Sequence, residues 1–288
     1  MKITPLHSRF AACVQGIDCS AQLASPAVSE VLAALDQHSV LIFPQQDLTP
    51  ADQVRFSSYF GPLEQAITRM GDDDVARQIA LLSNVNDDGT LRSISDRKML
   101  FHRGNEMWHT DSTYKPQTAL ASLLYAVEVP PSGGQTHFAS TRAAYADLDD
   151  ERKALVDEGF ATHSLAYSRA KVAQDLMSDE LKKSLPPVER PLVRSNPATG
   201  DRSLYIASHA FAVRGMNEQA GLSLISQLLD WCTREEYVYR HDWQVGDLVM
   251  WDNRSTLHRA TPFDAATHRR VMRRSTVIDA QYMASLAA

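Results

Sequence analysis

Asp247-Leu-Val-Met-Trp-Asp-Asn-Arg-Ser-Thr-Leu-His-Arg-Ala260 is the stretch of sequence that decides the fold and first points to a site. Its first half is short, apolar and rich in strand-forming residues, which predicts a strand at Leu248–Trp251. The preceding Gln244-Val-Gly-Asp247 is a turn signal. His258 follows the strand. A lone histidine is most often a buried structural residue, so its role depends on its surroundings.

A second strand is predicted downstream, at Val271–Ile278, and four arginines lie within six residues around its start. Side chains alternate between the faces of a strand, so Arg270 and Arg274 share one face. Arg269 and Arg273 share the opposite face, and exposure to solvent accounts for them. An inward arginine requires an anionic partner, because an unpaired buried charge is costly. A bound dicarboxylate is such a partner, since guanidinium grips carboxylate through two parallel hydrogen bonds.

Trp108-His-Thr-Asp111 supplies a second set of residues with metal-binding chemistry. On an extended chain the side chains of His109 and Asp111 point the same way, so both can face one ion. Together with His258 they form the triad of two imidazoles and one carboxylate that leaves positions open on iron(II). Ten histidines and 35 acidic residues in 288 give roughly one His-x-acid match by chance, so the first motif has little weight alone.

Short strands separated by turns dominate the second half of the chain. The predicted strands are Leu120–Val129, Thr136–Ala139, Leu204–Ala207, Tyr237–His241, Leu248–Trp251 and Val271–Ile278. Helical patterns interrupt them at Arg142–Glu158 and Glu218–Thr233. This arrangement predicts a mainly β fold, a barrel or jelly roll, with flanking helices packed outside.

The first half begins with helix signals on either side of a short strand. Ser25 is the expected N-cap of a helix with Pro26 at its first position, and apolar residues follow at helical spacing. Ser39–Phe43 is a predicted buried strand bounded by a proline. Thr49-Pro-Ala-Asp52 resembles a capping box and opens a second helix that runs toward Phe60.

Residues 64–107 are polar and irregular, with an acidic run and a turn signal at Asp87-Asp-Gly89. They are read either as a surface loop or as a mobile lid over a site. No repeat, low-complexity tract or flexible linker divides the chain, which predicts a single domain over residues 1–288.

The composition of the chain limits the classes of binding partner and the compartment that we expect. A formal charge of −6 argues against nucleic acid, because neutralising phosphates requires an excess of Lys and Arg. Cys13, Cys19 and Cys232 match neither a zinc-ligand spacing nor a complete disulfide set, which favours a reducing compartment. The first residues lack the apolar core of a signal peptide, and the longest apolar stretch, Ala119–Val127, is too short for a membrane span. A cytoplasmic protein without a membrane partner is expected, and its oligomeric state, a homo-oligomer included, is left open.

Taken together, these motifs resemble the taurine dioxygenase family of 2-oxoglutarate-dependent oxygenases, particularly its dichlorophenoxyacetate dioxygenase branch. The likeness covers nearly the whole chain. It is carried by Pro5-Leu-His7, Phe10-Ala-Ala12, Asp18, Ser39–Phe43, Phe60-Gly-Pro-Leu-Glu64, Trp108-His-Thr-Asp-Ser112, Val129-Pro-Pro-Ser-Gly-Gly-Gln-Thr136, Arg142-Ala-Ala-Tyr145, Tyr239-Arg-His241 and Val245–Ala260.

The resemblance implies a double-stranded β-helix, or jelly roll, with the metal site at one mouth. By position in the family motifs, His109, Asp111 and His258 would ligate Fe(II). Thr136 and Arg270 would contact the distal carboxylate of the co-substrate 2-oxoglutarate. The spacing from His258 to Arg270 is one residue longer than in some relatives, which leaves Arg269 as a rival.

The resemblance also implies a substrate-binding role for two residues. Asn105 matches an asparagine near co-substrate and substrate, and Arg274 matches an arginine near the keto-acid end or the anionic head of the substrate. The implied reaction consumes O₂ and 2-oxoglutarate, with ascorbate as an activator, and hydroxylates a small anionic substrate. For an aryloxyalkanoate such as a phenoxyacetate, the products would be a phenol and glyoxylate.

Two alternatives remain open at this point. The substrate could be an alkyl sulfonate such as taurine, or another small carboxylate, with Arg69, His102 and Arg103 of the variable loop contributing to its pocket. From a different class, the chain could be a non-catalytic cupin-like metal-binding barrel. The pairing of Thr136 with Arg270 argues against that barrel, because a structural metal needs no dicarboxylate pocket. His163, His209 and His241 have no spacing that distinguishes them from surface or core residues.

Overall fold

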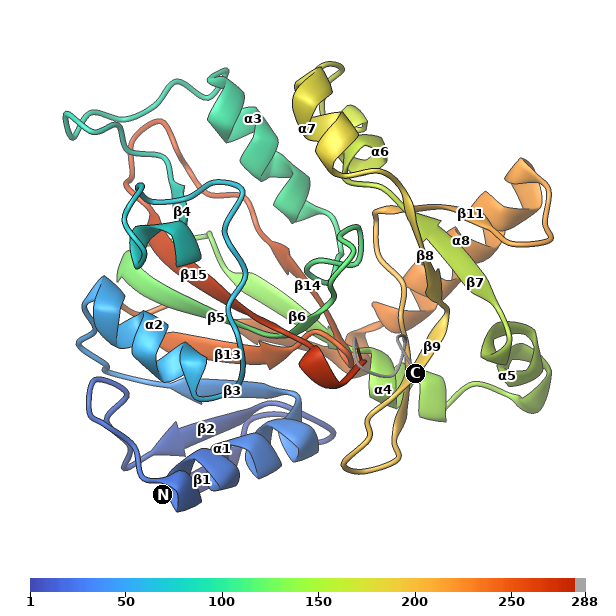
Figure 1. Cartoon of the computed structure of the whole chain (residues 1–288), viewed down its shortest axis with the longest axis horizontal. Coiled ribbons are helices and arrows are strands. Elements are labelled where there is room, and N and C mark those ends of the chain that lie inside the picture. The colour runs from blue at the N-terminus through green and yellow to red at the C-terminus, as the bar shows by residue number, and fades with distance from the viewer. Residues whose placement is uncertain (283–288) are drawn as a thin grey trace.

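The computed structural model describes residues 1–282, and its largest sheet in that range has seven strands (Figure 1). In spatial order these are β1 (Lys2–Pro5), β2 (Ala12–Gln15), β3 (Val40–Phe43), β13 (Leu248–Asp252), β5 (Ala119–Glu128), β15 (Val271–Ile278) and β4 (Ala80–Ser83). Strands β2 and β3 run parallel, and the other neighbours are antiparallel.

A smaller sheet stacks on the large one and completes the jelly roll. Its strands, in spatial order, are β12 (Val238–His241), β6 (Thr136–Ser140) and β14 (Thr256–Ala260). Two further sheets extend the chain beside this sandwich. They are formed by β11 (Ala210–Val213), β7 (Phe160–His163) and β8 (Val188–Pro191), and by β10 (Arg202–Leu204) and β9 (Val193–Ser195).

The alternation of side chains along β13 shows where the core lies. Val249 and Trp251 pack with Phe138 of β6 in the cluster between the two sheets. Leu248 and Met250 point to the opposite face and join the cluster beneath the first two helices. Both faces of this strand are therefore buried, which explains why its sequence is apolar without interruption.

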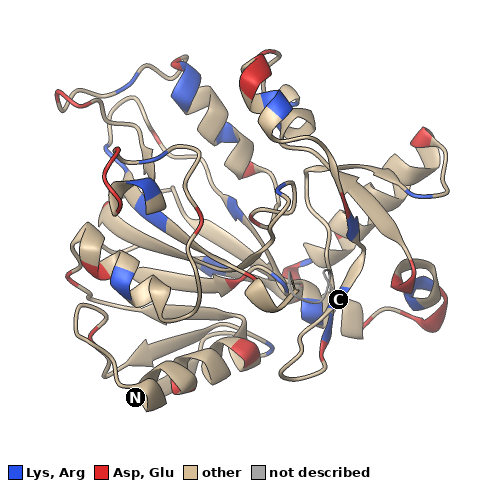
Figure 2. Cartoon of the chain, in the orientation of Figure 1, with Lys and Arg blue, Asp and Glu red and all other residues tan. Residues whose placement is uncertain are grey.

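The helices cover the sheets from outside. They are α1 (Ser25–His38), α2 (Pro50–Ser58), α3 (Arg97–Arg103), α4 (Thr141–Ala146), α5 (Asp150–Asp157), α6 (Leu165–Ala170), α7 (Asp179–Ser184) and α8 (Glu218–Cys232), with 3-10 turns η1 (Ala76–Gln78), η2 (Gly104–Glu106) and η3 (Glu235–Tyr237). Figure 1 shows α1 and α2 on one side of the large sheet, and α3 and α6 above the sheet in this view. Figure 2 shows acidic and basic residues interspersed along α5 and α7.

The predicted mainly β jelly roll with flanking helices is confirmed. The capping box is also confirmed: Asp52 N donates to Thr49 Oγ1 at 3.1 Å, and Thr49 N donates to Asp52 Oδ2 at 3.0 Å. The N-cap prediction for Ser25 is wrong by one residue. The cap is Ala24, and the proline following Ser25 already lies in the first turn.

Three further segment predictions need correction. The helix expected over residues 142–158 is two helices, because Asp149 accepts a hydrogen bond from Arg152 N at 2.8 Å and starts α5. Residues 205–207 are buried as expected but lie beyond the end of β10. Residues 64–107 are not irregular throughout, since they contain η1, β4, α3 and η2. Strand β4 pairs with β15, so its backbone is held by the large sheet.

Arg273 lies on the face of β15 that was predicted to be solvated, and that prediction is wrong for this residue. Its side chain is buried, donates to the carbonyl of Leu48 and lies 4.8 Å from the ring centre of Tyr125. Helix α2 packs over this part of β15 and excludes water from it. None of the helices in residues 1–282 is both long and apolar enough to cross a bilayer.

Candidate metal centre and active site

A single β-bridge brings the two predicted histidine ligands together. The backbone N–H of His109 donates to the carbonyl of His258 at 3.0 Å, and the N–H of His258 donates back at 2.7 Å. Residues paired in this way project their side chains from the same face. The two imidazole rings accordingly lie with their centroids 4.2 Å apart. His258 is fixed further by β14, where it pairs with Phe138 of β6.

Asp111 is placed beside the histidines by Asn253. The side-chain oxygen of Asn253 accepts from Asp111 N at 3.1 Å, and its backbone carbonyl accepts from Thr110 Oγ1 at 2.7 Å. Ser122 Oγ donates to Asp111 Oδ2 at 2.7 Å and orients the carboxylate. Asn253 lies within the stretch that first indicated the fold, but no pattern in the sequence marked it or Ser122 as a supporting residue.

The predicted triad is assembled in the structure. His109, Asp111 and His258 are buried and each offers a ligand atom within 4.8 Å of the others. His109 Nδ1 donates to the carbonyl of Met107 at 2.8 Å, which leaves Nε2 free to bind a metal. Burial lowers the pKa of His109 to about 4 and holds that of His258 well below its usual value.

The protonation of the triad suits a metal. Burial opposes ionisation of Asp111, but nearby positive charge, first that of Arg274, outweighs it, so the pKa of this carboxyl lies well below its usual range. Neutral imidazoles and an ionised carboxylate are the forms that ligate metals. Two imidazoles and one carboxylate on one side fit iron(II) with further positions left open.

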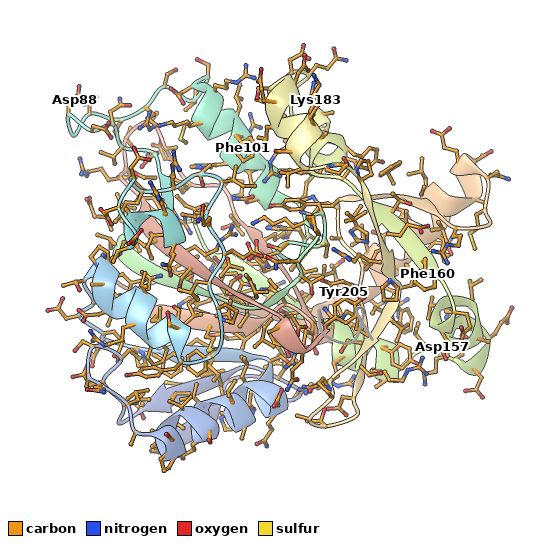
Figure 3. The ribbon with its side chains drawn as sticks, in the orientation of Figure 1. Asp88, Phe101, Asp157, Phe160, Lys183 and Tyr205 are labelled. Atoms are coloured by element: carbon orange, nitrogen blue, oxygen red, sulfur yellow. The ribbon has the colours of Figure 1, made fainter. Side chains whose placement is uncertain are left out.

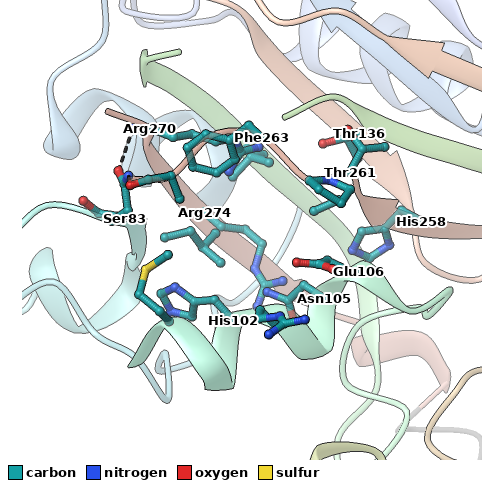
Figure 4. Close-up of a pocket in the computed structure, with 18 of the residues that line it drawn as sticks. Ser83, His102, Asn105, Glu106, Thr136, His258, Thr261, Phe263, Arg270 and Arg274 are labelled. Carbon is teal, nitrogen blue, oxygen red and sulfur yellow. Dashed lines mark hydrogen bonds between the residues drawn. The ribbon is translucent and has the colours of Figure 1, made fainter. Parts of the chain in front are cut away.

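A cavity of about 390 Å³ lies against the triad, and the residues predicted for co-substrate and substrate line it. Figure 4 shows Thr136 and Arg270 along one side of this cavity. His102 and Asn105 lie along the opposite side, with Arg274 between the two sides. The cavity therefore has two differently built walls, with the metal site at one end.

The guanidinium of Arg270 lines this cavity as an unpaired cation. Its Nε is buried without a hydrogen-bond partner, and no ion pair to it is found in residues 1–282. Asn84 Oδ1 accepts from its backbone N–H at 2.8 Å and fixes the chain there. Burial lowers the pKa of Arg270 to about 10, which still leaves it charged at neutral pH. Arg269 differs, because it is exposed and its Nε lies 2.6 Å from a carboxylate oxygen of Glu128.

Glycine at position 134 lets the turn before β6 approach Arg270. Its φ is +66°, and a Cβ there would lie 3.0 Å from Pro130 Cγ and 3.3 Å from Arg270 Nε. A larger residue would therefore be strained and crowded. Thr136, buried at the start of β6, accepts a hydrogen bond from Trp243 Nε1 at 3.0 Å. The turn thus fixes Thr136 on the same side of the cavity as Arg270.

Arg274 and Asn105 line the cavity, and each already has a partner. Arg274 Nη1 donates to Asp111 Oδ1 at 2.7 Å, so this arginine lies directly beside the metal ligands. Asn105 Oδ1 accepts from Arg169 Nη2 at 2.9 Å. Asn105 thus lies on the side opposite Arg270, and Arg274 lies between the two sides.

The loop residues considered from the sequence separate into two groups. His102 and Arg103 line the cavity, and burial lowers the pKa of His102 to about 4. Arg69 is exposed and pairs with Asp72 at 3.0 Å, so it does not line this cavity.

Two residues near the triad were not predicted. His209 is buried with its ring centroid 5.8 Å from that of His109, and Arg169 reaches Asn105 from α6. Neither residue has a distinctive spacing in the sequence, because tertiary contacts alone bring them to the site. His163 is buried without lining the cavity, and His241 pairs with an aspartate, as expected for structural residues.

Similarity to known proteins extends over nearly the whole chain. The family model described as taurine catabolism dioxygenase TauD, TfdA family matches residues 2–276. The alpha-ketoglutarate-dependent 2,4-dichlorophenoxyacetate dioxygenase of Cupriavidus pinatubonensis is 38% identical over 278 residues, 96% of each chain. The (S)-phenoxypropionate/alpha-ketoglutarate-dioxygenase of Sphingobium herbicidovorans is 39% identical over 283 residues, 96% of this chain and 94% of that one. The crystal structure of AAD-2 in complex with Mn(II) and N-oxalylglycine has a TM-score of 0.89 at 39% identity, covering 96% of this chain and 97% of that one.

Proposed function

The chain belongs to the taurine catabolism dioxygenase TauD, TfdA family, and we propose that it is an Fe(II)- and 2-oxoglutarate-dependent dioxygenase acting on an aryloxyalkanoate such as a phenoxyacetate. The observation that carries the proposal is a buried His-Asp-His triad whose two histidines line one cavity, with Arg270, which has no ion pair in residues 1–282, on a separate wall of that cavity. A metal site alone explains the triad. A metal site with an anion-binding arginine in the same cavity supports a bound keto acid.

His109, Asp111 and His258 would hold the iron. When bound with 2-oxoglutarate and O₂, the metal supplies the oxidant that hydroxylates a C–H bond, while the keto acid leaves as succinate and CO₂. The protein positions the reactants and limits the access of water to the reacting carbon. Trp251 and Leu124 are buried beside the triad and line the cavity, so the reacting carbon is held against apolar walls.

Arg270 and Thr136 bind the distal carboxylate of 2-oxoglutarate in this proposal. Arg270 offers a guanidinium whose Nε has no hydrogen-bond partner in residues 1–282, and Thr136 adds a hydroxyl from the same wall. A charge-assisted pair formed here removes the cost of leaving the half-buried guanidinium of Arg270 unpaired. The exposed Arg269 is not needed, because Glu128 already neutralises it.

Arg274 and Asn105 face the primary substrate. Arg274 lines the cavity from beside Asp111, and its Nε is buried without a hydrogen-bond partner among the residues that the structure describes. A substrate carboxylate placed there brings the adjacent carbon near the metal ligands. Hydroxylation of that carbon, when it also bears an ether oxygen, gives a hemiacetal that collapses to a phenol and glyoxylate.

We place the reaction in the cytoplasm, where a small anionic metabolite is available and the free cysteines Cys13, Cys19 and Cys232 remain reduced. The relatives named above are dioxygenases of 2,4-dichlorophenoxyacetate and (S)-phenoxypropionate, which supports an aryloxyalkanoate over taurine as substrate.

Substrate-dependent succinate release tests this function. The enzyme is assayed with Fe(II), ascorbate and 2-oxoglutarate, and with phenoxyacetate, (S)-2-phenoxypropionate, taurine or no addition. Succinate that rises with the two phenoxy acids, and an Asp111→Ala control that shows no rise, support the proposal. Succinate that rises only with taurine contradicts the choice of substrate. No rise with any compound, despite bound iron, favours a non-catalytic barrel.

A further inference from the structure

A second, smaller cavity of about 40 Å³ shares part of its lining with the first and is also lined by Asp111. The residues that line both cavities include Leu82, His102, Asn105, His109 and Arg274. A space of this size holds one small polar group and no whole organic molecule. It therefore suits the head group of a ligand whose body lies in the larger cavity.

Of the lysine and arginine residues that line the small cavity, some form ion pairs with carboxylates and one forms none within residues 1–282. Lys115 forms an ion pair with Glu64, and Arg274 forms one with Asp111 at 2.7 Å. Arg169 is also buried and lines this cavity, but no carboxylate pairs with it in the described part of the chain. The small cavity is thus lined by a cation that forms no ion pair with residues 1–282.

Helix α3 and the turn after it hold the guanidinium of Arg169 in place. Its Cζ lies 4.6 Å from the ring centre of Phe101, which Figure 3 labels on α3. A Cβ on Gly104 would lie 2.0 Å from Arg169 Nη1, so only glycine leaves room for the group. Asn105 Oδ1 accepts from Nη2 at 2.9 Å. The group is oriented before any ligand binds, which reduces the entropic cost of binding.

Two nitrogens of the same guanidinium lack a hydrogen-bond partner among the described residues. Arg169 Nε and Nη1 are buried without a hydrogen-bond partner in residues 1–282. One bond to the neutral Asn105 and one aromatic contact do not offset the cost of burying a full charge. A purely structural role therefore does not explain why position 169 holds a charged residue. An anionic ligand explains it, because it would form an ion pair with the guanidinium.

We propose that Arg169 binds the carboxylate of the primary substrate in the small cavity, where it acts together with Arg274. The inference rests on the proposed function, because it assigns the head group of that substrate. The aryl body then lies in the larger cavity, against apolar side chains that include Ile94, Met99 and Phe263. Arg169 is accordingly a specificity-determining residue that selects organic acids over their neutral analogues.

Paired ligands of nearly equal shape test this assignment. Enzyme loaded with Mn(II) and 2-oxoglutarate is titrated calorimetrically with phenoxyacetate and with the neutral phenoxyacetamide. Loss of a charge-assisted pair predicts that Arg169→Met weakens binding of the acid about 100-fold. Binding of the amide should change less than about threefold, because it makes no ion pair. Arg169→Lys should weaken acid binding about tenfold, since it keeps the charge but not the planar fork.

A matched control separates binding from structure. Arg190 is about as buried as Arg169 and donates to backbone carbonyls, but it lines neither cavity. Arg190→Met should therefore preserve the preference for the acid. Equal losses for acid and amide in Arg169→Met, or unchanged affinity for the acid, overturn the inference. If Arg169→Met does not fold, the acid-to-amide ratio of Arg169→Lys decides, and an unchanged ratio overturns the inference.

Phenol release by the unaltered enzyme is measured in parallel. Phenol release combined with unchanged acid affinity in the Arg169 variants overturns this inference and leaves the proposed function standing. Tight, Arg169-dependent binding without phenol release or succinate contradicts the proposed function and supports the binding role. No binding of phenoxyacetate by the unaltered enzyme rejects both.

Discussion

The two walls of the large cavity are built by different means. Thr136 and Arg270 stand on or beside strands β6 and β15, whose positions are fixed by ladder hydrogen bonds. His102 and Asn105 come instead from the short helix α3 and the 3-10 turn η2, and Asn105 is contacted by Arg169 of α6 across 64 positions of sequence. The strand-built wall is suited to binding 2-oxoglutarate, which is the same co-substrate whatever the primary substrate is. The helix-built wall can vary without disturbing the barrel, which suits the part of the site that selects the substrate.

The metal ligands belong to neither wall, and their loss should have the largest effect. Asp111→Ala removes one of three protein ligands, so we expect turnover to fall more than about 1,000-fold and iron affinity to fall sharply. Iron content after dialysis and succinate release measure the two effects. Ser122→Ala, which removes only a hydrogen bond to Asp111, should cost about 10- to 100-fold. An Asp111→Ala enzyme with normal iron content and activity would remove the triad assignment.

The next largest effect is expected on the strand-built wall. Arg270→Ala leaves the distal carboxylate of 2-oxoglutarate without its pair, which costs about 2–5 kcal/mol. The KM for 2-oxoglutarate should therefore rise at least about 30-fold, while the affinity for phenoxyacetate stays nearly constant. Arg269→Ala is the matched control, because its exposed pair with Glu128 contributes little. A large rise in KM for Arg269→Ala instead would show that the two arginines have been assigned in the wrong order.

Arg274 lies between the walls, and its removal should affect both substrate and metal. Arg274→Ala loses a cation that faces the substrate and also the hydrogen bond to Asp111 Oδ1. We expect a loss of about 10- to 100-fold in kcat/KM for phenoxyacetate, with weaker iron binding, and little change in the KM for 2-oxoglutarate. Kinetics with each substrate varied in turn test this. A change confined to the 2-oxoglutarate KM would assign Arg274 to the strand-built wall.

The smallest effect is expected for the hydrogen bond from Trp243 that supports Thr136 on the strand-built wall. Trp243→Phe removes the donor to Thr136 Oγ1 but keeps an aromatic ring in the core. A neutral hydrogen bond contributes about 1 kcal/mol, so the KM for 2-oxoglutarate should rise about fivefold or less. The response to substrate analogues should not change. An altered choice between phenoxyacetate and phenoxyacetamide in this variant would show that the two walls are coupled.

Sequence patterns predicted the strand-built part of the site because strands obey a simple period. Alternation along β15 placed Arg270 toward the cavity and Arg269 toward solvent, as the structure confirms. The same rule failed for Arg273, since the pattern of one strand does not reveal that α2 covers its outer face. The metal triad could be predicted because His109 and Asp111 share one short motif, although the β-bridge between His109 and His258 is a tertiary feature.

The helix-built part could not be predicted in the same way. Arg169 and His209 lie far from the metal motifs in sequence, and they are buried near the triad through tertiary contacts, Arg169 with Asn105 and His209 with His109. Polar residues around β4 and α3 concealed these elements within a segment that resembles a loop. Mobility of residues 64–107 and a single domain over residues 1–288 remain predictions.

The stoichiometry of phenol and succinate is the most direct test of the central claim. The enzyme is supplied with Fe(II), ascorbate, 2-oxoglutarate, O₂ and phenoxyacetate, and both products are quantified over several turnovers. The proposed reaction predicts one phenol and one glyoxylate for each succinate, and none of the three without the metal. Succinate formed without phenol, in amounts that do not depend on phenoxyacetate, would contradict the claim that this protein cleaves aryloxyalkanoates.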